Sequence, residues 1–241
     1  MGKMILCFEV TILNYLNLEK FTLFMFGKLE IIAGGMFGSK TTSLILETNR
    51  YRVKTQVQIF SPTIDNRYTI GEITTHDGLR APSENIPNSE EIINKLKKDT
   101  KVIGIDEITM FDEEILNVID YLQNKGKIII VSGLLLDFRG NYFPFRDKSN
   151  IELDSTKNMS DLIKKSPHIL LKSSMCNEEM NGSICGLDTF HTQRYMSDGI
   201  TIAPYEDKTI IIGKDTITET EKHKLKRIYK PKCIEHFISY K

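Results

Sequence analysis

The stretch LEIIAGGMFGSKT, residues 29–41, decides the fold of this chain. Its apolar run predicts a buried strand, its glycines predict a tight loop, and a helical pattern follows from Lys40 to about Arg52. This is the order of a phosphate-binding loop, in which backbone N–H groups and a helix N-terminus face a polyphosphate. Lys40 is expected to neutralise the terminal phosphates, and the Thr41 hydroxyl to ligate Mg²⁺. We therefore predict that the stretch binds ATP and Mg²⁺.

The loop departs from the common pattern G-x-x-x-x-G-K-[ST] at Ser39, where a glycine is expected before the lysine. Gly38 stands one position early, as if the two residues were exchanged. A side chain at position 39 either crowds the phosphates or takes a positive φ, which costs a non-glycine residue roughly 1–2 kcal/mol. Taken alone, the stretch is equally well read as a glycine-rich turn without a ligand.

Two adjacent acids, Asp106 and Glu107, follow a second buried strand at 102–105. Acids at this place are common in enzymes that bind nucleotides through a phosphate loop. We expect Asp106 to hold Mg²⁺, directly or through water, and Glu107 to take a proton from a hydroxyl or a water. The alternative is a solvent-facing acid pair at the end of a strand, and the phosphate loop favours the catalytic interpretation.

Apolar runs and helical patterns alternate along residues 27–172. This alternation predicts an α/β fold with a mostly parallel sheet and helices on both faces. Strands are predicted at 29–33, 57–60, 102–105, 128–131 and 168–171, and helices at 40–52, 89–98 and 111–122, the last ended by Gly126. After about Lys172, glycines, polar residues and cysteines dominate up to a predicted strand at 210–212, so residues 173–241 are predicted to form a smaller C-terminal lobe.

Charge and cysteine content narrow the class of protein. Lysine plus arginine and aspartate plus glutamate both number 32, so no overall positive field favours nucleic acid or an anionic membrane as a partner. Four scattered cysteines do not form a disulfide framework, which favours reduced thiols in the cytoplasm. Residues 1–26 have neither a membrane-spanning apolar run nor a signal-peptide pattern. We expect a non-catalytic extension, strand-like or helical, or a start codon placed too early.

Six stretches, in order and at suitable separations, resemble the type II thymidine kinases. Residues 34–42 resemble that family's G-P-M-F-S-G-K-T-T and share Met36 and Phe37, which a phosphate loop in general does not require. Residues 105–111 resemble I-D-E-A-Q-F-F, with Thr109 and Met110 departing from it. The other stretches are 65–68 (D-x-R-Y), 75–78 (T-H-D-G), 133–143 (G-L-D-x-D-F-R-G-x-P-F) and 190–194 (F-T-x-R). The resemblance covers about residues 27–213.

The resemblance implies a RecA-like core with a small C-terminal lobe of the lasso and zinc type. It implies ATP-dependent phosphorylation of thymidine, with deoxyuridine as another substrate, at the 5′-hydroxyl. The implied catalytic residues are Glu107 as general base, Arg67 as the residue that stabilises the phosphoryl group in transfer, and Asp65 nearby. The residues implied to bind ATP and Mg²⁺ are Gly34, Gly35, Met36, Phe37, Gly38, Ser39, Lys40, Thr41, Thr42 and Asp106. Those implied to bind the nucleoside are Met36, Leu134, Phe138, Phe143, Thr192 and Arg194, and for Phe138 and Phe143 the alternative is plain core packing.

The family usually binds a structural zinc through two C-x-x-C pairs, and this sequence departs from that pattern. Cys176 matches the first ligand, Glu179 stands at the second, and the second pair is expected near Lys222 and Leu225. One alternative is a rearranged site, and the other is reduced cysteines without a metal. The candidates for a rearranged site are Cys176, Cys185 and Cys233 with either His223 or His236.

Two functional alternatives to a thymidine kinase remain open at the level of sequence. One is a catalytically impaired nucleotide-binding relative, suggested by Ser39, Thr109 and the altered zinc pattern. The other is a RecA-like ATPase coupled to nucleic acid, against which the balanced charge argues. The family's tyrosine that packs over the sugar is expected near 217–218 and is missing there, with Tyr205 as a substitute. The resemblance also implies a tetramer inhibited by thymidine triphosphate.

Overall fold

The computed structural model describes residues 27–64, 71–75, 77–210 and 226–240. The predicted N-terminal extension 1–26, the predicted catalytic residues Asp65 and Arg67, and most of the predicted strand 210–212 lie outside these ranges. No helix in the described part of the chain is both long and apolar enough to cross a membrane.

A six-stranded parallel sheet forms the centre of the structure, with the strand order β10-β1-β7-β6-β2-β5. The prediction of an α/β fold with a parallel sheet is confirmed, and each of the five predicted strands is present. The sixth, β5, was not predicted, since it has three residues and ends next to Pro87. The bounds are β1 Lys28–Gly34, β2 Gln56–Pro62, β5 Glu84–Ile86, β6 Thr100–Ile105, β7 Ile128–Leu134 and β10 His168–Lys172.

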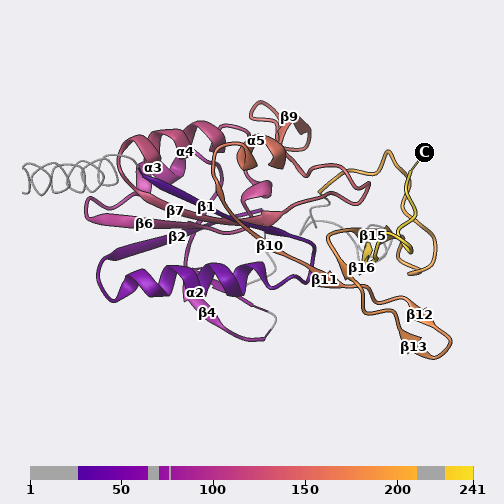
Figure 1. Cartoon of the computed structure of the whole chain (residues 1–241). Coiled ribbons are helices and arrows are strands. Elements are labelled where there is room, and N and C mark those ends of the chain that lie inside the picture. Colours follow the sequence, from indigo (N-terminus) through magenta and orange to yellow (C-terminus); the bar gives the residue numbers. More distant parts are fainter. Residues whose placement is uncertain (1–26, 65–70, 76, 211–225, 241) are drawn as a thin grey trace, which may run out of the picture.

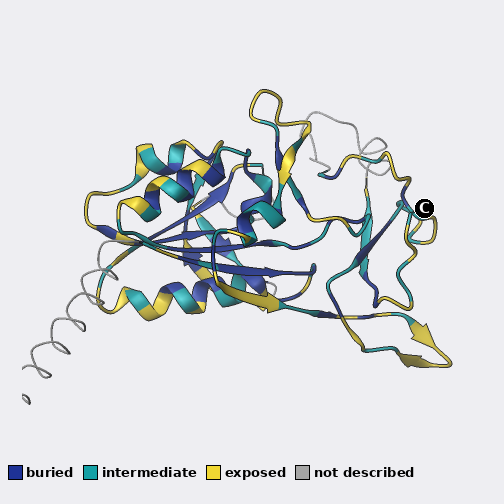
Figure 2. Ribbon diagram, turned by 45° about the horizontal axis from the view of Figure 1, so that its top comes forward, coloured by how far each residue is buried: buried dark blue, intermediate teal, exposed yellow. Residues whose placement is uncertain are grey.

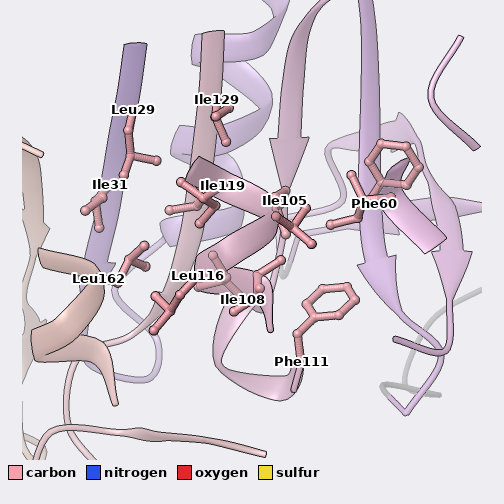
Figure 3. Close-up of a cluster of buried hydrophobic side chains, with 14 of the residues drawn as sticks. Leu29, Ile31, Phe60, Ile105, Ile108, Phe111, Leu116, Ile119, Ile129 and Leu162 are labelled. Carbon is pink, nitrogen blue, oxygen red and sulfur yellow. The ribbon is translucent and has the colours of Figure 1, made fainter. Parts of the chain in front are cut away.

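Helices cover both faces of this sheet (Figure 1). Helix α2 (Lys40–Arg52) lies on one face, and α3 (Glu91–Lys95), α4 (Ile115–Asn124) and α5 (Met159–Ile163) lie on the other. Alternate strand residues enter the two layers, because side chains of a strand point to opposite faces in turn. Ile31, Ile103 and Ile129 pack with α4, whereas Ile32 and Ile130 pack with α2. Figure 3 shows the α4 layer, with Ile119 of α4 among the strand residues.

Two predicted helices are shorter in the structure. The prediction for 111–122 started too early, because a 3-10 turn, η1 (Ile108–Met110), precedes Phe111, which is itself extended. Ser89, predicted to open the helix 89–98, instead donates its backbone N–H and its hydroxyl to the Asp112 carboxylate. Helix α3 therefore begins at Glu91. Gly126 has φ +68 and follows α4, as predicted for a residue that ends a helix.

The described chain beyond Lys172 forms only short antiparallel pairs. These are β11 (Ser174–Met175) with β14 (Asp188–Thr189), β12 (Glu179–Met180) with β13 (Ser183–Ile184), and β15 (Thr192–Tyr195) with β16 (Ile228–Pro231). Figure 2 shows the β12–β13 hairpin as exposed, in contrast to the buried central sheet. Two further antiparallel pairs lie in the connections between strands of the central sheet. They are β3 (Glu72–Thr74) with β4 (Arg80–Pro82), and β8 (Pro144–Arg146) with β9 (Asp154–Asn158).

Candidate active site

The phosphate-binding loop lies at the carboxyl end of β1, against the end of β10. A Cβ atom added to Gly38 would lie 2.7 Å from the Lys172 carbonyl oxygen, and one added to Gly34 would lie 2.0 Å from it. A side chain at either position would therefore displace the edge strand. Ser39 takes the left-handed conformation with φ 53 and ψ 36, so the predicted positive φ is confirmed. The close approach of Lys172 thus requires glycine at position 38, whereas nothing in the structure explains a serine at position 39.

The Lys40 side chain contacts the phosphate loop itself, whereas the Thr41 side chain contacts the residue that follows β6. The Lys40 ammonium donates to the Gly35 carbonyl oxygen at 2.7 Å, and the lysine is 9% exposed. The Thr41 hydroxyl lies 3.2 and 3.1 Å from the two carboxylate oxygens of Asp106. The pair predicted to bind Mg²⁺ is thus in direct contact, and its oxygen atoms are the ligand type that Mg²⁺ prefers.

Ser132 is a third member of this contact, and it was not predicted. It lies on β7, is 1% exposed, and its hydroxyl donates to the same Asp106 carboxylate. Strand β7 lies between β1 and β6, so Ser132 is placed beside the residue that follows β6. The sequence did contain a signal for Ser132, because its hydroxyl comes directly after the apolar run Ile128–Val131. Burying a polar group in such a strand is costly unless the group has a hydrogen-bond partner, so a buried serine there indicates a partner.

The environment of Asp106 raises its pKa from 3.8 to about 7. Burial is the main cause, and the neighbouring Glu107 carboxylate adds to it. Hydrogen bonds from Ser132 and Thr41 act in the opposite direction. A divalent cation at this carboxylate would supply the positive charge that favours its ionised form.

A cavity of about 370 Å³ joins the phosphate loop to Glu107. Glu107 takes the left-handed conformation, with φ 48, at the turn between β6 and η1. Of the residues predicted to bind the nucleoside, Met36 and Leu134 line the cavity. The remaining lining residues are Phe37, Gly38, Ser39, Lys40, Thr41, Thr42, Thr74, Thr75, Asp77 and Met110.

Four of these lining residues were not among the predicted site residues: Thr74, Thr75, Asp77 and Met110. The sequence carried a signal for most of them. Thr75 and Asp77 belong to the stretch that resembles T-H-D-G, and Met110 comes three residues after the predicted base. The structure thus brings these separate stretches to one cavity.

The other predicted nucleoside contacts lie outside this cavity. Phe138, Phe143, Thr192 and Arg194 are all buried, and none of them lines the cavity. The Arg194 guanidinium lies 3.8 Å from the centre of the Phe138 ring and donates to the carbonyl oxygens of Lys208 and Thr209. A substrate role for these four residues stays a prediction.

Three cysteines and a histidine gather in the C-terminal part of the described chain. Their ligand atoms lie within 4.8 Å of one another, and the residues are Cys176, Cys185, Cys233 and His236. The His236 Nδ1 atom lies 3.5 Å from Cys176 Sγ and 3.2 Å from Cys233 Sγ, and Cys185 Sγ lies 3.9 Å from Cys233 Sγ. A tetrahedral zinc with bonds of about 2.3 Å places two sulfurs roughly 3.8 Å apart, so the spacing fits zinc.

The cluster corrects the expected place of the second ligand pair. That pair was expected near Lys222 and Leu225, which lie outside the described residues, as does His223. The structure instead places Cys233 and His236, three residues apart, beside Cys176. Both residues follow β16, and a histidine stands where the family pattern has a cysteine. Of the two histidine candidates, His236 is therefore the one found in the cluster.

Replacing Ser39 by glycine is expected to stabilise the protein. Glycine adopts a positive φ without the steric cost that a Cβ atom brings, so we expect a gain of about 1 kcal/mol in the free energy of unfolding. Urea denaturation measures it. Ser43→Gly, one helical turn further along in α2, is the matched control and is expected to destabilise by roughly 0.5–1 kcal/mol. A loss of stability in Ser39→Gly would contradict the strain at this residue.

Replacing Asp106 by asparagine is expected to change stability in a pH-dependent way. The raised pKa means that between about pH 4 and 7 the folded protein holds a proton that the unfolded chain has released. Stability of the parent protein therefore falls as pH rises through this window, whereas asparagine does not titrate. In EDTA, the free energy of unfolding of the variant minus that of the parent should rise by roughly 1–3 kcal/mol from pH 4 to pH 8.

Urea denaturation at several pH values checks this expectation. Asp198→Asn is the control with the opposite sign, because hydrogen bonds from Thr201 and Ile200 lower the pKa of Asp198. That titration lies at and below about pH 4, so this variant should lose stability relative to the parent only between the most acidic samples and about pH 5, and the difference should stay level above that. A difference between Asp106→Asn and the parent that is flat from pH 4 to 8 would rule out the raised pKa.

Comparison with known proteins agrees with the geometry of the site. Residues 27–219 match the sequence model of the thymidine kinase family. A thymidine kinase of Thermococcus kodakarensis is 31% identical over 218 residues, which cover 88% of this chain and 94% of that protein. The match spans the phosphate loop, the Asp106–Glu107 pair and the first cysteines of the cluster. The chain belongs to the thymidine kinase family.

Proposed function

We propose that this chain transfers the γ-phosphoryl group of ATP to the 5′-hydroxyl of thymidine, with deoxyuridine as a second substrate. The observation that carries the proposal is the cavity that contains both the phosphate loop and the Glu107 carboxylate. A phosphate donor on the loop and an acceptor hydroxyl at Glu107 would therefore meet in one cavity. An ATPase coupled to nucleic acid has no need of the apolar wall formed by Met36 and Leu134.

The residues divide the reaction between them. Backbone N–H groups of the loop and the Lys40 ammonium hold the phosphates, and Lys40 exchanges its contact with the Gly35 carbonyl for them. Thr41 and Asp106 would hold Mg²⁺, which neutralises charge on the phosphate oxygens when bound. Glu107 takes the proton of the 5′-hydroxyl as its oxygen bonds to the γ-phosphorus, and the bond from that phosphorus to the ADP oxygen breaks.

The remaining predicted residues complete this proposal. Arg67 is assigned to stabilising charge on the transferred phosphoryl group, with Asp65 near it, and both lie outside the described residues. Met36 and Leu134 form an apolar wall for the thymine ring. A catalytically impaired relative is the alternative, motivated by the strain at Ser39. The contact between Thr41 and Asp106 and the position of Glu107 in the cavity favour an active enzyme.

The Glu107→Gln variant should lose phosphoryl transfer. Glutamine has nearly the same shape but does not accept the proton, so we expect a fall in kcat of about 10²–10⁴-fold. The assay follows labelled thymidine monophosphate formed from Mg·ATP and thymidine, and ATP binding should persist. Glu114→Gln, just before α4, is the matched control and should retain the parent rate.

Three outcomes of this assay would contradict the proposal. Nucleotide binding without product in the parent protein would identify an impaired relative. ATP hydrolysis stimulated by DNA, with thymidine unused, would identify an ATPase. Full activity of Glu107→Gln would remove Glu107 from the role of base.

We further propose that the cluster of three cysteines and His236 binds one structural zinc. The cluster joins three separate segments: Cys176 follows β11, Cys185 follows β13, and Cys233 and His236 follow β16. Burial opposes ionisation of Cys176, but hydrogen bonds from the Cys233 backbone and His236 lower its pKa overall. Thiolates are the form in which cysteines bind zinc.

The purified protein is expected to contain one zinc per chain, measured by elemental analysis. Cys185→Ser and His236→Ala should lose most of it, because structural sites keep four protein ligands. Glu179→Ala and His168→Ala are the controls: Glu179 stands where the family has a cysteine, and His168 is an exposed histidine on β10. Zinc retained by His236→Ala but lost from Glu179→Ala would contradict this ligand set.

Assembly, regulation and location are implied by the family resemblance and the cysteine content only. A tetramer, inhibition by thymidine triphosphate and a cytoplasmic location stay predictions.

A further inference from the structure

A cluster of aromatic and arginine side chains holds the first part of the loop that connects β15 to β16. We call it the aromatic clasp, and its members are Phe138, Arg139, Arg194, Tyr205 and Tyr240. The resemblance of residues 190–194 to F-T-x-R implies that the segment after Arg194 covers the substrate, and the structure describes residues 196–210 and 226–227 of it. The clasp connects to the candidate active site through residues 134–138, since Leu134 lines the cavity and Leu135 donates its N–H to the Gly34 carbonyl oxygen at 3.0 Å.

Two arginines of the clasp bind the backbone of this loop. Arg139 donates to the Tyr205 carbonyl oxygen at 2.7 Å and to the Thr209 hydroxyl at 2.8 Å. Arg194 is 2% exposed and donates to the carbonyl oxygens of Lys208 and Thr209. Five fixed donors make a guanidinium well suited to gathering several carbonyl oxygens. Residues 205–209 are thereby fixed to the D-F-R-G stretch through Arg139 and to β15 through Arg194.

Both guanidinium groups lie over the Phe138 ring. The centre of that ring is 4.2 Å from the Arg139 guanidinium carbon and 3.8 Å from that of Arg194. A cation over an aromatic face is stabilised by the ring's negative charge density, more so where water is excluded. Phe138 is 3% exposed, so its ring serves as the base on which the two arginines are stacked.

Tyr240 completes the clasp from a distant part of the sequence. Its ring meets Phe138 edge to face, with 5.8 Å between centres, and lies 5.7 Å from Tyr205. Its hydroxyl donates to the Ala203 carbonyl oxygen at 2.6 Å. The Ile238 N–H donates to the buried Gln193 side chain at 2.9 Å, which holds the segment of Tyr240 against β15. Tyr240 therefore touches both the fixed part, at Phe138, and the loop, at Ala203 and Tyr205.

We propose that Tyr240 is a positioning residue for the nucleoside, acting through residues 203–209 of the covering loop rather than on the reacting atoms. The proposal rests on the proposed function, in which this loop covers thymidine. Without the Tyr240 ring, residues 203–205 lose the bridge that this ring forms to Phe138, although Arg139 still donates to the Tyr205 carbonyl oxygen. Lys40, Thr41 and the phosphate loop have no contact with Tyr240 among those described and keep their own. The effect should therefore fall on the nucleoside and spare ATP.

Two variants separate the contributions of Tyr240. Tyr240→Phe removes only the hydrogen bond to Ala203 and should raise the KM for thymidine about threefold to tenfold. Tyr240→Ala also removes both ring contacts and should raise it roughly 10- to 50-fold. For both variants we expect the KM for ATP and the zinc content to stay within about twofold of the parent. Tyr121→Ala, a partly exposed tyrosine on α4, is the control and should leave both KM values unchanged.

A second measurement does not depend on catalysis. Trypsin should cleave the parent slowly after Lys208, whose carbonyl oxygen accepts from Arg194, and Tyr240→Ala should be cleaved there several times faster. Faster cleavage confined to this loop supports the clasp even if the parent makes no thymidine monophosphate, an outcome that would overturn the proposed function alone. An unchanged KM for thymidine in Tyr240→Ala, or equal rises in both KM values with cleavage throughout the chain, would overturn the positioning role.

Discussion

The buried carboxylate of Asp106 is the group on which the arrangement of the site depends. An anion at 6% exposure is costly unless it is hydrogen-bonded. Thr41, which follows the β1 loop, and Ser132, on β7, supply hydroxyls to it. Both hydroxyls reach one carboxylate because β1, β7 and β6 are neighbouring parallel strands whose carboxyl ends share one edge. The strand order is therefore a condition for the site and not only a scaffold beneath it.

The central sheet, the phosphate loop and the contact of Thr41 with Asp106 could be predicted because local patterns determine them. Short runs rich in apolar residues marked the five long strands, and the glycines with Lys40 marked the loop. The errors came where a tertiary contact overrides the local pattern. Ser89 has the chemistry of a helix cap but bonds the distant Asp112, and Phe111 has helical spacing but packs after a 3-10 turn. No residue near either position in the sequence indicates these contacts.

The departures from the family pattern have physical reasons that appear only when distant segments meet. Gly38 is needed because the end of β10 passes beside it, although β10 comes more than a hundred residues later in the chain. In the cysteine cluster, Glu179 replaces an expected ligand, and Cys185 from the far side of the β12–β13 hairpin takes part instead. The sequence supplied the correct candidates but could not choose between His223 and His236, since three segments without fixed spacing converge there.

Phe138 shows how a resemblance and a structure assign one residue in different ways. The family pattern places Phe138 and Arg194 at the thymine, whereas the structure stacks them on each other beside the covering loop. The two assignments are compatible if the loop is itself part of the nucleoside site. A ring fixed by two guanidinium groups has little freedom of its own, so it positions whatever packs against it. The precision of the nucleoside site would then depend on the clasp, although none of the clasp residues lines the cavity itself.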